Sequence, residues 1–226
     1  MLFDPRYIVM VLLPGLLLGG LAAWYTRSTF ARYARVRSSS GMTGAEAAAR
    51  LLGTAGVTGV RIEPSHGFLS DHYDPRVRAL RLSPQVYASA SLAAVGIACH
   101  EAGHALQHAA GFAPLKARSA LVPVTQLGSQ LSFPIIFAGL FLRAPALIDV
   151  GVLLFAAVVL FTLVTLPVEW DATVRAKRGM VRSGIVGAAE APHAGAVLNA
   201  AFLTYVASAA TAILTLLYYL TLARRR

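Results

Sequence analysis

Charged residues are scarce in this chain. Only 13% of its 226 residues are Asp, Glu, Lys or Arg, whereas hydrophobic residues make up 57%. Soluble domains usually contain about a quarter charged residues, because a surface in contact with water needs them. The shortage predicts that a lipid bilayer, and not water, covers much of this protein.

Cysteine and acidic residues are also few. The single cysteine, Cys99, excludes an intrachain disulfide, and 20 basic against 10 acidic residues give a net charge of +10. A nucleic-acid partner would need basic residues interleaved with aromatic residues on one face. Here the basic residues cluster beside apolar stretches, within residues 27–37 and 175–182. Such flanks suit anionic lipid headgroups, so we favour a membrane and exclude nucleic acid as the partner.

Four apolar stretches are long enough to cross a bilayer as helices, which takes about 20 residues. They cover roughly residues 7–25, 120–142, 144–168 and 197–222. The first is longer than the apolar core of a signal peptide, about 7–15 residues, and is predicted to be a retained anchor. Only Arg143 and a few neighbours separate the second and third, which predicts a helical hairpin.

The predicted fold class is mainly α, a multi-span helical membrane protein with a small α+β region between spans. Five segments follow from the pattern: an N-terminal anchor (1–26), a cytoplasmic-side α+β region (27–119), a transmembrane hairpin (120–168), a polar segment (169–196) and a C-terminal span (197–226). Both polar segments carry the basic excess, which places them in the cytoplasm and the terminal Arg224–Arg226 outside. Because two spans lie between them, the polar segments lie on the same side of the membrane.

The region between the first two spans shows short elements. Thr43 to Glu46 reads as a capping box that opens a helix through Leu52. Strands are predicted at residues 60–63 and 79–82, with a polar turn at 68–75, and a further helix is expected at 91–110 with Gly111 as its end. Residues 79–82 are interpreted as an edge strand, to which a peptide could add as a further strand.

The motif that carries chemistry is His100-Glu101-Ala102-Gly103-His104, which fits H-E-x-x-H. Residues four apart share one face of a helix, so both imidazoles can reach one zinc ion. The motif predicts that the α+β region at 27–119 is zincin-like. Glu101, next to the first ligand, can then act as the general base that takes a proton from water and passes it to the leaving amine. A buried helix with two incidental histidines is the other interpretation, but a buried glutamate between them is costly without a role.

Catalytic zinc needs a third protein ligand and an open position. Glu169 and Asp171 follow the third span and share the side of the motif. They are two residues apart, so both are not expected to bind the same ion. We favour Glu169 as the ligand, with Asp171 as a supporting partner or the alternative ligand.

The remaining histidines and Cys99 have weaker assignments. His108, four residues after His104, is either a group beside the ligands or substrate, or a histidine that merely ends the helix. Cys99 is interpreted as a packing residue. His66, His72 and His193 are expected in loops, where one of them could stabilise an oxyanion.

Several stretches resemble the YugP-like family of bacterial membrane zinc metallopeptidases. They are residues 71–75, 80–84, 100–107 and 166–172. The resemblance implies zinc-dependent hydrolysis of polypeptides at a bacterial inner or plasma membrane. The site also looks like that of zinc peptidases with a glutamate ligand, many of which carry an aspartate four residues later. Here that position is Thr173, so support for a histidine is expected from Asp171 or elsewhere.

Three functional interpretations are open. The first is a zinc metalloendopeptidase that acts on membrane or membrane-proximal polypeptides, with its site on or near the cytoplasmic face. The second is a non-catalytic membrane scaffold or binding protein that retains a metal site, which would have no need of Glu101. The third is an intramembrane protease, whose ligands would lie within the spans. Neither the substrate sequence nor the oligomeric state follows from these residues.

Overall fold

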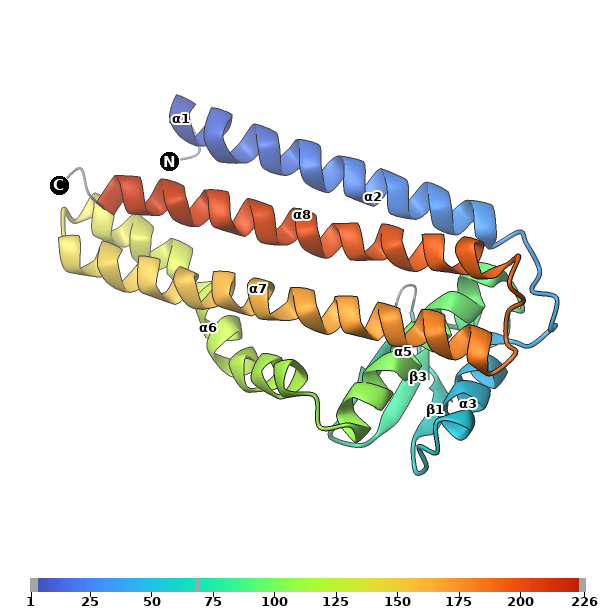
Figure 1. Cartoon of the computed structure of the whole chain (residues 1–226). Coiled ribbons are helices and arrows are strands. Elements are labelled where there is room, and N and C mark those ends of the chain that lie inside the picture. Colours follow the sequence, from blue (N-terminus) through green and yellow to red (C-terminus); the bar gives the residue numbers. More distant parts are fainter. Residues whose placement is uncertain (1–3, 68–69, 224–226) are drawn as a thin grey trace. The chain divides into compact units, whose positions relative to one another are not determined.

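The computed structural model describes residues 4–67 and 70–223 of the chain (Figure 1). Within these residues the protein is mainly helical and has a small three-stranded sheet, which confirms the predicted fold class. The elements in chain order are α1 (Pro5–Tyr7), a π-helical turn η1 (Ile8–Leu12), α2 (Leu13–Tyr33), α3 (Gly44–Thr54), β1 (Arg61–Pro64), β2 (His72–Asp74), β3 (Ala79–Leu82), α4 (Pro84–Tyr87), α5 (Leu92–Ala109), α6 (Ala113–Phe141), α7 (Pro145–Arg182) and α8 (Ala191–Ala223).

Four helical stretches in the described residues are long and apolar enough to cross a membrane. They are Pro5–Tyr33, Ala113–Phe141, Pro145–Arg182 and Ala191–Ala223. Each contains most or all of one predicted span and extends it. The largest difference is in α7, which continues to Arg182, well past residue 168 where the third span was expected to end. Hydropathy marks only the apolar part of a helix, whereas the following Ala, Arg and Lys residues are also good helix formers. The arginines at 224–226 lie outside the described residues.

The chain divides into two compact units, and the first consists of Met1–Ala22, Ala113–Pro167 and Thr204–Arg226. Helix α6 and the first part of α7 form the predicted hairpin in this unit. Glycines permit their close approach, since a Cβ at Gly151 would lie 2.9 Å from Ser132 O and one at Gly139 would lie 2.9 Å from Ile148 N. Small residues at such crossings are typical of helices packed in membranes.

The second unit, Ala23–Phe112 with Val168–Leu203, contains the sheet and helices α3 and α5. The predicted capping box is present: Thr43 Oγ1 accepts from Glu46 N, and Glu46 Oε2 accepts from Thr43 N. Helices α3 and α5 pack against each other and against the sheet. Their shared apolar core includes the fully buried Leu51, Leu80 and Val95.

The sheet order is β1-β3-β2, so residues 79–82 form the central strand and not an edge. The prediction of an edge strand there is wrong. Strand β1 pairs with β3 in parallel, and β2 pairs with it antiparallel on the other side. Ala79, Leu80 and Leu82 are fully buried, since β3 lies between two strands and also contacts helices α4 and α5. The expected turn at 68–75 contains β2; its residues 68–69 lie outside the described residues.

A polar clamp in the second unit joins the segment after α2 to the segment before α8. Ser39 N and Ser39 Oγ donate to the carboxylate of Glu190 at 2.8 and 2.7 Å. Gly187 N donates to the same carboxylate at 3.2 Å. Partial burial raises the pKa of Glu190, but these hydrogen bonds lower it more, so its pKa lies below the ordinary glutamate value.

Candidate metal centre

Helix α5 presents the motif as the residue spacing predicts. Ser91 Oγ caps its start by accepting from Ala94 N at 3.2 Å, and Gly111 ends it with a φ of +65°. The side chains of His100 and His104 lie one above the other, with ring centroids 4.9 Å apart. Both histidines are therefore available to one ligand from the same face of the helix.

A close contact between α5 and α7 brings the third residue to this face. The backbones approach at Gly103, where an added Cβ would lie only 2.7 Å from Ala172 O. Ala172 is itself fully buried. The glycine inside the motif therefore permits the helix crossing that places Glu169, one turn before Ala172, beside the two imidazoles.

The three donors converge closely. Glu169 Oε2 lies 3.1 Å from His100 Nε2 and 3.6 Å from His104 Nε2, and one ligand atom from each residue lies within 4.8 Å of the others. Zinc in tetrahedral coordination holds such atoms about 2.0–2.2 Å from the ion, hence about 3.3–3.5 Å from each other. Two imidazoles and one carboxylate are also a known donor set for catalytic zinc. The residues therefore fit this metal.

Burial explains why a cation belongs between these groups. Glu169 is 1% exposed and His104 is 8% exposed, so water cannot solvate their charges. Burial alone would lower the pKa of the His104 imidazole, but the hydrogen bond to Glu169 and the charges of Glu101 and Glu169 raise it above the ordinary histidine value. The site stabilises positive charge at His104 Nε2, where either a proton or a metal ion can supply it.

A buried glutamine fixes the tautomer of His104. Gln107 Nε2 donates to Val168 O at 2.7 Å and to Asp171 Oδ2 at 2.9 Å. Both partners are acceptors, so the amide oxygen must be the atom facing His104 Nδ1 at 2.9 Å. That oxygen can only accept, so Nδ1 carries the proton and Nε2 offers its lone pair to a metal.

Asp171 lies outside the three-donor cluster, at the end of this series of hydrogen bonds. Its Oδ2 accepts from Gln107 Nε2 and from Arg175 Nε, the latter at 2.5 Å. Arg175 also lies over the ring of Phe112. Asp171 is thus placed to orient His104 through Gln107, which is a supporting position.

Thr173 supports the other histidine. Its hydroxyl lies 3.3 Å from His100 Nδ1 and the residue is 1% exposed. The expectation that support must come from Asp171 or elsewhere did not consider threonine as the partner. The signal was present, since Thr173 follows Glu169 by one helical turn, but its importance depends on which face of α7 meets α5.

Glu101 differs from Glu169 in its surroundings. It is only partly buried, and in residues 4–67 and 70–223 its side chain makes no hydrogen bond or ion pair. Its charge nevertheless acts on His104. Glu101 therefore offers a carboxylate next to the candidate ligands, and this carboxylate is available to bind and release a proton.

The other candidates lie apart from the cluster. His108 Nδ1 is 2.8 Å from the hydroxyl of Tyr73, His72 Nδ1 is 2.7 Å from Ser70 O, and His193 stacks on Tyr33. His66 is not among the grouped donors either. Cys99 is fully buried in the core, which raises the pKa of its thiol well above the usual range and fits a packing role.

A protein with four apolar helices and a His–His–Glu group that could hold a metal ion is similar to known membrane zinc peptidases. The sequence profile of the family described as "putative neutral zinc metallopeptidase" matches residues 8–224. The protein is 42% identical over 203 residues to the "putative membrane protease YugP" of Bacillus subtilis (strain 168), covering 88% of this sequence and 90% of that protein. The chain belongs to this family of zinc metallopeptidases. No solved structure matches it.

Proposed function

We propose that this protein is a zinc metalloendopeptidase that hydrolyses peptide bonds in membrane or membrane-proximal polypeptides. The observation that carries the proposal is the convergence of His100, His104 and Glu169, with the carboxylate of Glu101 adjacent to them on α5. Two imidazoles and a carboxylate leave one coordination position open on a tetrahedral ion, as catalysis requires.

The residues have two kinds of role: some would bind the metal and one would transfer protons. His100, His104 and Glu169 would hold zinc, which when bound supplies Lewis acidity and lowers the pKa of water toward about 7. Glu101 would accept the proton that the attacking water loses and give it to the departing amine. Gln107 and Thr173 would keep the imidazoles oriented so that this geometry is set before substrate arrives.

The location of the site favours substrates near the membrane. Helix α7 carries both an apolar stretch able to cross a bilayer and, just beyond Pro167, the carboxylate of Glu169. Glu169 therefore follows the apolar run that ends near residue 168 of the sequence, and this order along the chain favours a membrane-proximal peptidase over an intramembrane one. The basic flanks at 27–37 and 175–182 support a cytoplasmic position for the site.

The test is proteolysis by Glu101→Gln, assayed in detergent against an unstructured polypeptide. Glutamine keeps the shape and removes the proton acceptor, so we expect unchanged zinc content and a loss of hydrolysis of roughly a hundredfold or more. Glu63→Gln, at an ion pair on β1, is the matched control and should cleave like the parent protein. If Glu101→Gln cleaves as fast as the parent, the peptidase mechanism is wrong and a non-catalytic scaffold that retains a metal site becomes the better interpretation.

A further inference from the structure

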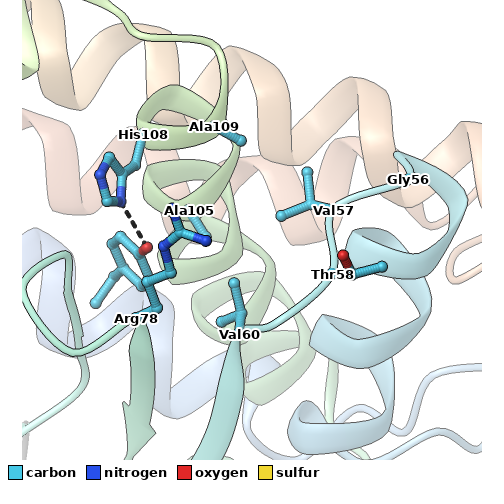
Figure 2. A pocket seen from close by; sticks show the side chains of 9 residues that line it. Gly56, Val57, Thr58, Val60, Arg78, Ala105, His108 and Ala109 are labelled. Carbon is cyan, nitrogen blue, oxygen red and sulfur yellow. Dashed lines mark hydrogen bonds between the residues drawn. The ribbon is translucent and has the colours of Figure 1, made fainter.

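A pocket of about 310 Å³ lies along α5 beyond the candidate metal ligands (Figure 2). It is lined by Gly56, Val57, Thr58, Val60, Tyr73, Arg78, Ala105, His108 and Ala109. His108 follows His104 by four residues, a displacement of about 6 Å along a helix. The pocket is therefore near enough for a peptide bound at the metal to reach it with the next few atoms of its backbone.

The pocket is lined by both apolar and polar side chains. Val57, Val60 and Ala105 supply apolar surface. Figure 2 shows Arg78 and His108 on the side away from Val57. The hydroxyl of Tyr73 lies 2.8 Å from His108 Nδ1, which fixes the position of both rings. A ligand for this pocket needs a short apolar part and a group that an arginine recognises.

Arg78 occupies a backbone position that does not suit arginine. Its φ is +48°, in the left-handed region that favours glycine or asparagine, at the end of the turn between β2 and β3. In the described part of the chain its guanidinium has no ion pair or hydrogen bond, whereas Arg76 in the same turn is paired with Asp74. The strained position holds a side chain that has no hydrogen bond or ion pair among the described residues and whose charge acts on Tyr73 in the same pocket.

The C-terminus of α5 repels an anion less than a helix C-terminus with unpaired carbonyl groups would. Ala110 N donates to Leu106 O, Gly111 N to His108 O, and Phe112 N to Gln107 O. These bonds satisfy the carbonyl groups of the last turn. The positive charge of Arg78 is therefore the main electrostatic feature of the pocket.

We propose that this pocket is a specificity subsite that binds a carboxylate of the polypeptide substrate through Arg78. The inference rests on the proposed peptidase function and adds a substrate class to it. The carboxylate belongs either to an acidic side chain or to the last residue of the substrate, since both present the same two oxygens to the guanidinium. The apolar residues of the pocket hold the carbon atoms next to that group.

The test measures peptide binding directly, in zinc-loaded Glu101→Gln protein in detergent micelles, so that no peptide is consumed. Three labelled peptides share one neutral sequence. The first has a free C-terminus, the second is amidated and carries an internal glutamate, and the third is amidated with glutamine in its place. We expect the first, the second or both to bind about tenfold tighter than the third, the value for one charge-assisted pair. Which of the two does so identifies the source of the carboxylate.

Arg78→Gly is the decisive variant, because glycine relieves the backbone strain at φ +48° and removes the whole side chain with its guanidinium. It should bind all three peptides equally, whereas the control Arg76→Ala should keep the preference. The subsite is overturned if the Glu101→Gln protein binds all three peptides equally, or if the preference survives when Arg78→Gly is added. If the active parent enzyme cleaves all three peptides at the same rate, the subsite alone is overturned and the peptidase function stands. A parent that neither binds nor cleaves any peptide overturns the proposed function together with it.

Discussion

The two parts of helix α7 differ in what they expose and what they bury. Residues 145–167 belong to the first unit and residues 168–182 to the second. In the first part large apolar side chains are exposed, with Leu153 at 72%, whereas in the second part Glu169 is 1% exposed. A single helix therefore carries exposed leucines at one end and a buried carboxylate at the other.

The difference shows that the exposure a side chain can tolerate depends on the medium around it and on the partners it can reach. Exposed leucines are stable where lipid is the solvent, since lipid tails are as apolar as the side chains. A buried carboxylate is stable only where partners or a metal compensate its charge, as His100 and His104 do for Glu169. Substitutions around the candidate metal centre should therefore affect zinc binding without affecting the apolar part.

The largest effect is expected for His100→Ala combined with His104→Ala. Parent protein should contain about one zinc per molecule and the double variant almost none, because two of three protein ligands are gone. Zinc content by elemental analysis is the measurement, and His66→Ala is the control that should keep its metal. Helical content by circular dichroism should stay the same in both, because the membrane helices do not depend on zinc. Full zinc occupancy in the double variant would contradict the assignment of the ligands.

Gly103→Ala should have the next largest effect, since its Cβ would meet Ala172 O at 2.7 Å. Backbone atoms cannot move aside easily, so we expect α5 and α7 to separate at a cost of about 1–3 kcal/mol. Weaker zinc binding should accompany the lower melting temperature, since Glu169 moves away from the histidines. Gly53→Ala, where nothing lies within 4 Å, should instead leave both properties unchanged or raise the melting temperature slightly. Equal behaviour of the two variants would show that the crossing does not position the ligand.

Gln107→Leu should weaken zinc binding by roughly 10–100-fold, the usual effect of losing the partner that orients a histidine ligand. Thr173→Val should have a smaller effect, because its contact with His100 Nδ1 is longer, 3.3 Å against 2.9 Å for the one between Gln107 and His104. Both replacements are close to isosteric, so packing is retained. Competition with a chelator of known affinity gives the two zinc dissociation constants. A larger loss of zinc affinity in Thr173→Val than in Gln107→Leu would contradict this prediction.

The smallest effect concerns the clamp at Glu190. Its folded pKa lies below its unfolded value of about 4.3, so its contribution is fully present above that value and is lost as pH falls through the folded pKa. We expect parent protein to lose more stability between pH 6 and pH 3 (roughly the window of glutamate titration) than Glu190→Gln does. The difference should be below about 1 kcal/mol because the carboxylate is solvated. Thermal unfolding at both pH values measures this difference in stability. Identical pH profiles of the two proteins would show that the Glu190 carboxylate does not stabilise the fold.

Local patterns predicted much of the fold and of the candidate site. The apolar stretches predicted all four membrane helices, and the spacing of His100 and His104 predicted their shared face. Two spans return the chain to the side of the motif and so predict that Glu169 or Asp171 lies near it, and the structure places the Glu169 carboxylate beside both histidines.

Features that depend on contacts between elements could not be predicted in this way. Strand β2 has only three residues, too few to show an alternating pattern, so the central position of β3 was missed. The roles of Gln107 and Thr173 depend on how α5 crosses α7, and only the position of Gly103 hints at that crossing. Glutamine and threonine are also common on helix surfaces, so neither residue type marks a site by itself.

The assignment of the third ligand is tested most directly by zinc affinity in Glu169→Gln and Asp171→Asn, measured side by side by chelator competition. Glutamine is a weak neutral ligand, so we expect Glu169→Gln to lose zinc almost completely. Asp171 acts through Gln107, so Asp171→Asn should keep about one zinc per molecule with an affinity reduced by roughly 10–100-fold. Loss of zinc from Asp171→Asn together with normal zinc binding by Glu169→Gln would contradict the site described for this protein.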